Sequence, residues 1–234
     1  MKRFFAVALA AALCLAACKK DDTLMNTLDA MGDVSASTIY SDNGFTFKVT
    51  KVSCEEDFTS QSRIAFTCNV LKKVSNLEYE VELLGWNRVL KKDYLLSSSA
   101  DEAAIGNDPI KITSIWASGY YLNIQIVCGI VPDSSTKHFI NLVLDEAAST
   151  DDTLHFTLHH NGYGESVTAG GDLGFDDVVF ARSYVSFPIQ DLIPRGGSMN
   201  VVVDWDWYVT EDEVMTPHTE TNSSTGIIHS VYSN

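Results

Sequence analysis

Basic residues are scarce in this chain. Its 234 residues include 16 Lys and Arg against 31 Asp and Glu, which gives a net charge of −15. Nucleic-acid binding depends on clustered Lys and Arg at phosphates, so this balance argues against nucleic acid as a partner. The hydrophobic fraction of 45% is ordinary for a folded protein, so the acidity does not indicate disorder.

A hydrophobic run long enough to cross a membrane is also missing. The longest run, Phe4–Ala17, has 14 residues, whereas a spanning helix needs about 20. It follows Lys2 and Arg3 and ends in Leu15-Ala16-Ala17-Cys18, the small-residue pattern of a lipoprotein signal. We therefore predict a signal peptide at 1–17 and lipidation at Cys18, so that the membrane is contacted through an N-terminal lipid. A plain signal peptide is the alternative.

The residues after Cys18 are charged. No aspartate follows Cys18 directly, so the usual signal for retention in the inner membrane is missing and we predict the outer membrane. The protein body could face either the cell surface or the periplasm. Lys19, Lys20, Asp21 and Asp22 resemble the surface-export tether of Bacteroidetes lipoproteins, or form a simple solvated linker. We assign the polar residues 18–33 to a tether.

Cysteine is scarce once processing is considered. Cys14 would leave with the signal and Cys18 would carry lipid, so Cys54, Cys68 and Cys128 remain. A disulfide between Cys54 and Cys68 would suit an oxidising compartment. Against it, Cys68 and Cys128 fall on the apolar phase of strand patterns, where a free cysteine acts as a small core residue. The cysteine spacings match no zinc motif, so no metal site is expected.

Alternation with period two dominates the rest of the chain and predicts strands. The clearest segments are 45–49, 64–70, 77–83, 110–112, 122–126, 140–144, 154–158, 185–189 and 201–207. At most one helical turn is expected, near 98–104. This pattern predicts an all-β protein built from barrels or sandwiches, with a domain boundary near residue 100. The polar segment 211–225 is predicted to be a long loop before a last strand at 227–232.

Motifs for catalysis are missing too. No serine lies in a nucleophile elbow, and the acids form surface stripes such as Glu78, Glu80 and Glu82. His155 and His159 share one strand face and could supply two metal ligands or part of a hydrolase site, but a solvent-facing strand explains them better. We predict no catalytic residue, no cofactor and no enzyme activity.

Two tryptophans offer a candidate binding surface. Alternation places Trp205 and Trp207 on one face of their strand and Asp204 and Asp206 on the other. An exposed tryptophan face would be a stacking platform for sugars or a protein partner. Because Val201 and Val203 continue the same face, a buried core position is the favoured alternative.

Several stretches resemble the NigD-like lipoproteins of Bacteroidetes. They are Ile105–Ile110, Trp116, Tyr121–Asn123, His138–Val143, His160-Asn161 and Tyr184–Phe187. The resemblance implies a small OB-like barrel, placed here at 34–100, followed by an antiparallel β-sandwich at 101–234, and implies no enzyme activity. In that phylum Asp22-Thr23-Leu24 and Asp152-Thr153-Leu154 resemble O-glycosylation sequons, so Thr23 and Thr153 are candidate sites.

Three functions follow as hypotheses. The first is an outer-membrane-anchored, non-catalytic binding module for a glycan or a protein. The second, suggested by the family name alone, is a role in bacteriocin production or immunity. The third is a hydrolase built on His155, His159 and nearby acids.

Overall fold

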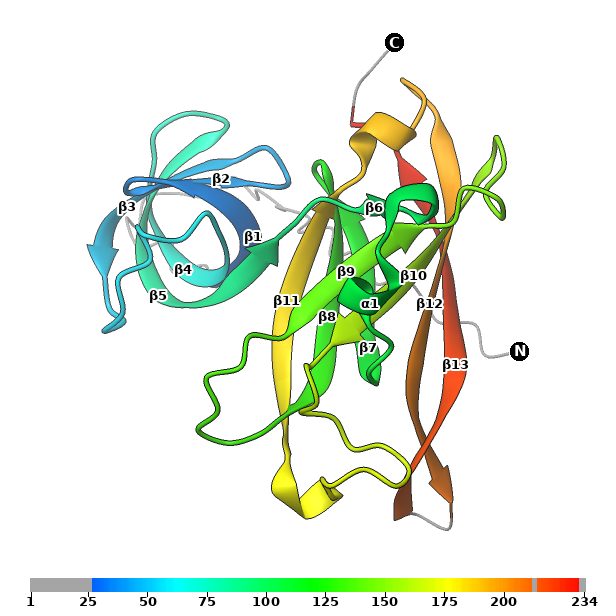
Figure 1. The fold of residues 1–234 in the computed structure, drawn as a ribbon. Coiled ribbons are helices and arrows are strands. Elements are labelled where there is room, and N and C mark those ends of the chain that lie inside the picture. The colour runs from blue at the N-terminus through cyan, green and yellow to red at the C-terminus, as the bar shows by residue number, and fades with distance from the viewer. Residues whose placement is uncertain (1–26, 212–213, 232–234) are drawn as a thin grey trace. The chain divides into compact units, whose positions relative to one another are not determined.

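The computed structural model describes residues 27–211 and 214–231. The chain divides into two compact units, residues 1–91 and 92–234, which are considered separately (Figure 1). Strands make up most of the described residues of both units, as the alternating pattern predicts. Within the described residues, no helix combines the length and apolar character that crossing a membrane requires.

The first unit is a closed five-stranded barrel. Its strands are β1 (Thr27–Ser35), β2 (Thr38–Ser41), β3 (Thr46–Val52), β4 (Arg63–Lys73) and β5 (Glu78–Lys91). β1 pairs antiparallel with β2 and β4, β2 pairs with β3, and β4 pairs with β5. A parallel pairing of β3 with β5 completes the ring, in the strand order of an OB-type barrel. The expected OB-like barrel is confirmed.

Alternation along these strands separates an apolar interior from a charged exterior. The buried interior consists of Ile39, Phe47, Val49, Phe58, Ile64, Phe66, Cys68, Val70, Val81 and Leu83. On the outside, the acids of β5 form ion pairs with lysines of neighbouring strands: Glu78 with Lys48, Glu82 with Lys51 and Glu80 with Lys72. The glutamate stripe is therefore a solvated face of the barrel.

Residues 27–33 belong to the barrel and not to a tether, which corrects the expected range 18–33. They lie in β1, where Leu28, Ala30 and Val34 pack against the core. Gly32 lies between Ala30 and Val34 in that row, and a Cβ there would lie 2.6 Å from the Tyr40 carbonyl oxygen. Crowding at the barrel wall thus requires a residue without a side chain, and this glycine interrupts the apolar row in the sequence.

The second unit contains two sheets and a short helical segment. Its elements are β6 (Leu95–Leu96), η1 (Ser97–Ser99), α1 (Glu102–Ile105), β7 (Ile110–Ser118), β8 (Tyr121–Ile130), β9 (Phe139–Leu144), β10 (Thr153–Asn161), η2 (Phe175–Asp177), β11 (Val179–Pro188), η3 (Gln190–Leu192), β12 (Ser198–Glu211) and β13 (Val214–His229). One sheet has the order β11-β8-β7, and the other has the order β13-β12-β10-β9-β6.

The two sheets form a β-sandwich, as expected. Most pairings are antiparallel, but β10–β12 and β6–β9 are parallel, so the sandwich is mixed. The buried rows on the inner faces include Leu122, Ile124, Ile126, Ile140, Leu142, Phe156, Leu158, Val185, Phe187, Val201 and Val203. Alternation with period two brings these residues to one face of each strand.

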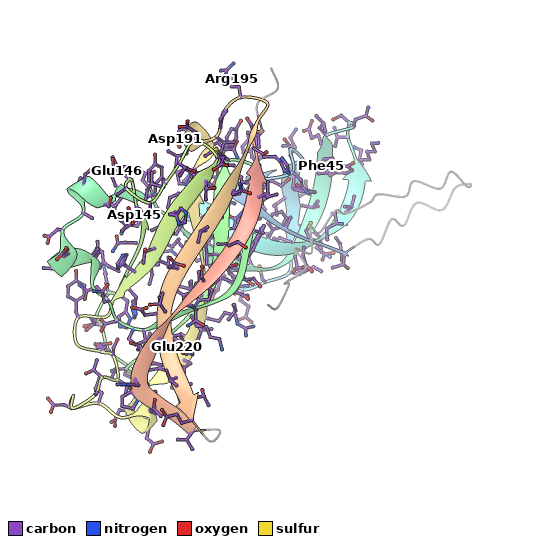
Figure 2. All side chains as sticks on the ribbon, turned by 90° about the vertical axis from the view of Figure 1, so that its right-hand side faces the viewer. Phe45, Asp145, Glu146, Asp191, Arg195 and Glu220 are labelled. Carbon is purple, nitrogen blue, oxygen red and sulfur yellow. The ribbon has the colours of Figure 1, made fainter. Side chains whose placement is uncertain are left out.

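The boundary between the units lies at residues 91 and 92, earlier than the expected 100 and 101. Residues 92–105 bind to the sandwich: β6 pairs with β9, and the Ser98 amide donates to the Glu146 carboxylate at 3.0 Å. Asp145 and Glu146 lie beside this segment (Figure 2). The single helical turn expected near 98–104 is present as η1 and α1.

The C-terminal segment is a strand where a loop was expected at 211–225. β12 and β13 form a long antiparallel hairpin, in which Ser198 pairs with His229 and Trp207 with Glu220 (Figure 1). β13 is an edge strand of its sheet and is largely exposed, so it has no apolar row to show in the sequence. Pro217 lies where the register shifts, a position that does not require its missing amide hydrogen.

Candidate functional site

A polar groove lies on the outer face of the five-stranded sheet. Its volume is about 240 Å³, and it is lined by Asn107, Asp108, Thr157, Leu158, His159, Asp204, Asp206 and Thr221. The register of the strands brings several of these side chains together, because Thr157 pairs with Asp204, and Asp206 pairs with Thr221. These side chains point away from the core since they alternate with buried residues such as Phe156 and Val203.

Hydrogen bonds inside the groove fix its side chains. The Thr221 hydroxyl donates to Asp206 at 2.7 Å. His159 Nδ1 lies 3.0 Å from the Gly106 carbonyl oxygen and 2.9 Å from Asn107 Oδ1, so it donates to them in the neutral imidazole. Nε2 of that neutral form is a hydrogen-bond acceptor. The groove therefore offers carboxylate, amide, hydroxyl and imidazole groups to a ligand.

One wall of the groove is the segment 105–109, which is attached to the end of β10. The Asp108 amide donates to the His160 carbonyl at 2.9 Å, and the Asp108 carboxylate accepts from the Gly162 amide at 2.7 Å. The Asn161 side chain donates to the Ala103 and Ala104 carbonyls of α1 at 3.3 and 3.1 Å. The stretches Ile105–Ile110 and His160-Asn161, noted above for their resemblance, thus meet at one place.

A second constellation lies at the same end of the sandwich, inside it. His138 Nδ1 is 2.9 Å from His160 Nε2, and His138 Nε2 is 3.2 Å from Glu165 Oε2. His160 Nδ1 is 3.2 Å from the Pro109 carbonyl oxygen. Ligand atoms of Cys128, His138 and His160 all lie within 4.8 Å of one another.

Burial sets the pKa values of His160 and Cys128 in this constellation, and hydrogen bonds set that of Glu165. His160 is fully buried, and burial together with the nearby His138 lowers its pKa to about 4. Burial raises the pKa of the Cys128 thiol to about 11. Hydrogen bonds from Ser134 and Thr136, with His138 beside them, lower the pKa of Glu165 to about 2. At neutral pH the site holds a neutral His160 and a Glu165 carboxylate.

The tryptophans do not form an exposed platform. Trp207 is buried in a cluster with Val167, Val178 and Tyr208, and Trp205 packs against that cluster. Trp86 and Trp116 are half-buried. Continuation of the apolar face from Val201 and Val203 into the sandwich accounts for this burial, so Trp207 is a core residue and Trp205 is a half-buried residue packed against the core.

The remaining sites predicted from the sequence are the cysteines, His155, Thr153 and the N-terminal residues 18–23. Cys54, Cys68 and Cys128 are free thiols, so Cys54 and Cys68 are not joined by a disulfide. His155 shares the outer face of β10 with His159 but does not line the groove. The Thr153 hydroxyl donates to Asp152 at 2.9 Å. Cys18, Lys19, Lys20, Asp21, Asp22 and Thr23 lie outside the described residues.

Sequence reasoning missed the constellation of Cys128, His138 and His160. The first and last lie on β8 and β10, in different sheets, so no fixed spacing along the chain relates them. One signal was present: each continues the inward apolar row of its strand, and a histidine on such a row needs polar partners when buried. From the sequence, His159 was paired only with His155, and Asp204 and Asp206 were placed only on the strand face opposite the tryptophans.

The second unit matches a known domain family. The model of the NigD-like C-terminal beta sandwich domain matches residues 94–216. No curated protein matches the chain.

Solved structures from Bacteroides species share the fold. A protein of unknown function from Bacteroides vulgatus ATCC 8482 is 20% identical with a TM-score of 0.59, over 87% of this chain and 90% of that one. A NigD-like immunity protein from Bacteroides caccae ATCC 43185 is 15% identical with a TM-score of 0.57, over 82% and 90%. A candidate lipoprotein from Bacteroides fragilis NCTC 9343 is 12% identical with a TM-score of 0.56, over 87% and 97%. Since the domain model covers more than half of the chain, this protein belongs to the NigD-like family.

Proposed function

We propose that this protein is a lipid-anchored binding module of the bacterial outer membrane, and that it binds a glycan without transforming it. The observation that carries the proposal is the polar groove on the outer face of the five-stranded sheet. It joins side chains from three strands and one ordered loop on a rigid scaffold. Such preformed arrays of polar groups give a site its orientation and specificity.

The chemistry of the groove suits hydroxyl-rich ligands. Carboxylates and the Asn107 carbonyl accept hydrogen bonds from sugar hydroxyls, and hydroxyl and amide groups donate to sugar oxygens. Three of the lining residues are aspartates, Asp108, Asp204 and Asp206, so polyanions are disfavoured at the groove. A neutral or cationic glycan is the favoured ligand, and a protein partner is the alternative.

Binding without turnover is distinguished from hydrolysis by the fate of the ligand. A glycan array probed with the purified chain identifies a retained glycan, which is then incubated with the protein and recovered. We expect its mass and chain length to be unchanged. Shortened products that disappear in His159→Gln would instead support the hydrolase hypothesis.

Matched variants locate the binding site. The double variant Asp204→Ala/Asp206→Ala removes two groove carboxylates, and we expect it to weaken retention at least tenfold, a loss of about 1.4 kcal/mol or more. Asp172→Ala alters an exposed acid in the loop after β10, outside the groove lining, and serves as the control. Equal binding by both variants would contradict the proposal. Capture of an envelope protein that depends on Asp206, with no glycan retained, would favour the protein alternative.

Anchoring at Cys18 has its own test. The lipobox-like Leu15–Cys18 supports lipidation, as does the fold shared with a candidate lipoprotein from Bacteroides fragilis. Cells fed a labelled fatty acid should incorporate it into the wild-type chain and not into Cys18→Ala. Fractionation and protease shaving of intact cells then report the membrane and the leaflet. Equal labelling of both chains would refute the anchor.

A role in bacteriocin immunity is the second candidate. It is suggested by two proteins that share the fold: the NigD-like immunity protein, and a candidate toxin-related protein from Parabacteroides distasonis ATCC 8503. Deletion of the gene should then increase killing of the producing strain by its own toxin. Unchanged toxin release and unchanged self-protection would exclude this role.

A further inference from the structure

We infer that Cys128, His138 and His160 bind one divalent transition-metal ion of the Zn²⁺ type. The three side chains come from β8, from the residue just before β9, and from β10. Within the residues that the structure describes, they form a group of potential ligands whose atoms all lie within 4.8 Å of one another. The site is separate from the groove and independent of the proposed function.

The hydrogen-bond partners of the two imidazoles indicate that a cation, either a proton or a metal ion, lies between them. A carbonyl oxygen can only accept, so His160 Nδ1 carries a hydrogen toward Pro109 and its Nε2 presents a lone pair. The Glu165 carboxylate likewise requires a hydrogen on His138 Nε2, and the neutral ring then presents a lone pair at Nδ1. Two lone pairs would face each other across 2.9 Å. Either an additional proton or a metal ion must lie between the nitrogens.

The nearby thiol of Cys128 favours a metal ion over an additional proton between the two histidines. A proton shared by His138 and His160 has no use for a thiol, whereas Zn²⁺ is bound by imidazole nitrogen at about 2.0–2.1 Å and by thiolate at about 2.3 Å. Tetrahedral geometry would place the two nitrogens about 3.3 Å apart, so the gap needs to widen by only a few tenths of an ångström. Cys128 is buried on the inner face of β8, and its Sγ lies within 4.8 Å of a ring nitrogen of each histidine.

The outward nitrogens of both rings are already held as metal-bound histidines usually are. Such histidines donate their second N–H to a carboxylate or a backbone carbonyl, which fixes the tautomer and the ring orientation. Glu165 takes this role for His138, and the Pro109 carbonyl takes it for His160. Glu165 is itself fixed by the Ser134 hydroxyl, which accepts from the Thr136 amide at 3.0 Å. The loop before β9 is thus arranged around His138.

Three protein ligands leave the fourth tetrahedral position for water or another small ligand. Cys128 and His160 belong to opposite sheets, and His138 closes the loop between β8 and β9. A bound ion would therefore cross-link the sandwich at the end where the segment 105–109 attaches. It would stabilise the folded state in proportion to its occupancy.

Cobalt is the most informative probe. The purified chain is stripped with a chelator, dialysed against Co²⁺ and examined by absorption spectroscopy. We expect a single Co²⁺ per chain, a thiolate-to-metal charge-transfer band and the intense visible bands of tetrahedral cobalt. Cys128→Ser should abolish the charge-transfer band, whereas Cys68→Ser, which alters a buried thiol in the core of the barrel, should retain it.

Zinc binding supplies the second readout. At a hundredfold excess over Kd, Zn²⁺ should raise the melting temperature by about 5–10 °C relative to the chelated protein. Glu165→Gln keeps all three ligands but weakens the orienting contact, so it should lower metal affinity by about 10–100-fold. His138→Gln, whose parent side chain is only partly buried, provides a ligand variant if Cys128→Ser fails to fold.

Two results would overturn the site. One is substoichiometric metal in the wild-type protein, without a charge-transfer band or a thermal shift. The other is identical binding by wild type, Cys128→Ser and His138→Gln, which would assign the metal to surface carboxylates.

Discussion

Gly106 shows how a single residue positions both features of the sandwich end. It caps α1 with φ of 66° and ψ of 174°, a region of backbone space that only glycine adopts without strain. A Cβ on this residue would lie 2.7 Å from Asn161 Cβ and 2.7 Å from the His160 carbonyl oxygen. The segment that forms a groove wall and bonds to His160 can approach β10 only because that side chain is missing.

Gly106→Ala should therefore destabilise the second unit by about 3 kcal/mol, from backbone strain and overpacking together. Gly170→Ala is the matched control, because Gly170 has φ of 77° but a Cβ added there would meet nothing within 4 Å. The control should lose about 1 kcal/mol from strain alone. Urea denaturation of the three chains measures the difference, and equal losses would show that close approach at β10 is unimportant.

Burial of Tyr208 predicts that the second unit loses stability at alkaline pH. Burial raises the pKa of its phenol to about 12, and the hydroxyl donates to the Val167 carbonyl at 3.1 Å. The unfolded chain releases this proton near pH 10, while the folded chain retains it. The folded state thus binds more protons between pH 10 and 12, so stability falls as pH rises through this window.

Tyr208→Phe should remove about 2 kcal/mol of that pH-dependent loss, although it also forfeits one hydrogen bond at every pH. The free energy of unfolding measured from pH 9 to pH 12 tests this. Tyr163→Phe, at a tyrosine that is 55% exposed, should keep the wild-type slope. Parallel curves for wild type and Tyr208→Phe would contradict the assignment.

A strand could be predicted from the sequence when one of its faces is buried, because only then do apolar and polar residues alternate. β4 and β10 alternate between buried and less buried residues over most of their length, and β8 does so from Ile124 to Cys128; each was predicted from its apolar alternation. β13 was missed because an edge strand is held by backbone hydrogen bonds and leaves its side chains exposed. β1 was missed because its apolar row contains Ala30 and Gly32, whose small size reflects crowding against β2.

The start of β4 joins three elements of the barrel through a buried charge. Arg63 is fully buried and contacts Asp42, after β2, at 2.6 Å and Asp33, on β1, at 3.4 Å. Asp42 is only 7% exposed, whereas Asp33 is 35% exposed. Removing a buried partner leaves an uncompensated charge in the interior, and this is more costly than losing a partly solvated one.

Asp42→Ala should accordingly destabilise the barrel by about 3–5 kcal/mol. Asp33→Ala should cost about 1 kcal/mol or less, because water replaces that carboxylate at its partly exposed position. Chemical denaturation followed by the barrel's own transition compares the two. A larger loss from Asp33→Ala would reverse the proposed order of importance.

At the scale of the whole molecule, the two-unit all-β architecture could be predicted, and the candidate site could not. Period-two alternation predicts which face of each strand is buried, but it contains no information on which strands become neighbours. The parallel pairing of β10 with β12 places Thr157 opposite Asp204, and Cys128 and His160 approach each other across the core. Both encounters depend on tertiary topology, which a single sequence does not specify.

We propose that the outer face of the five-stranded sheet binds the ligand. Hydrogen exchange of the purified chain, with and without the glycan retained on the array, tests it most directly. We expect slower exchange confined to 105–109, 157–161, 204–208 and 219–223, the segments that surround the groove. Unchanged exchange in these segments, or protection located in the barrel of residues 27–91, would contradict the account.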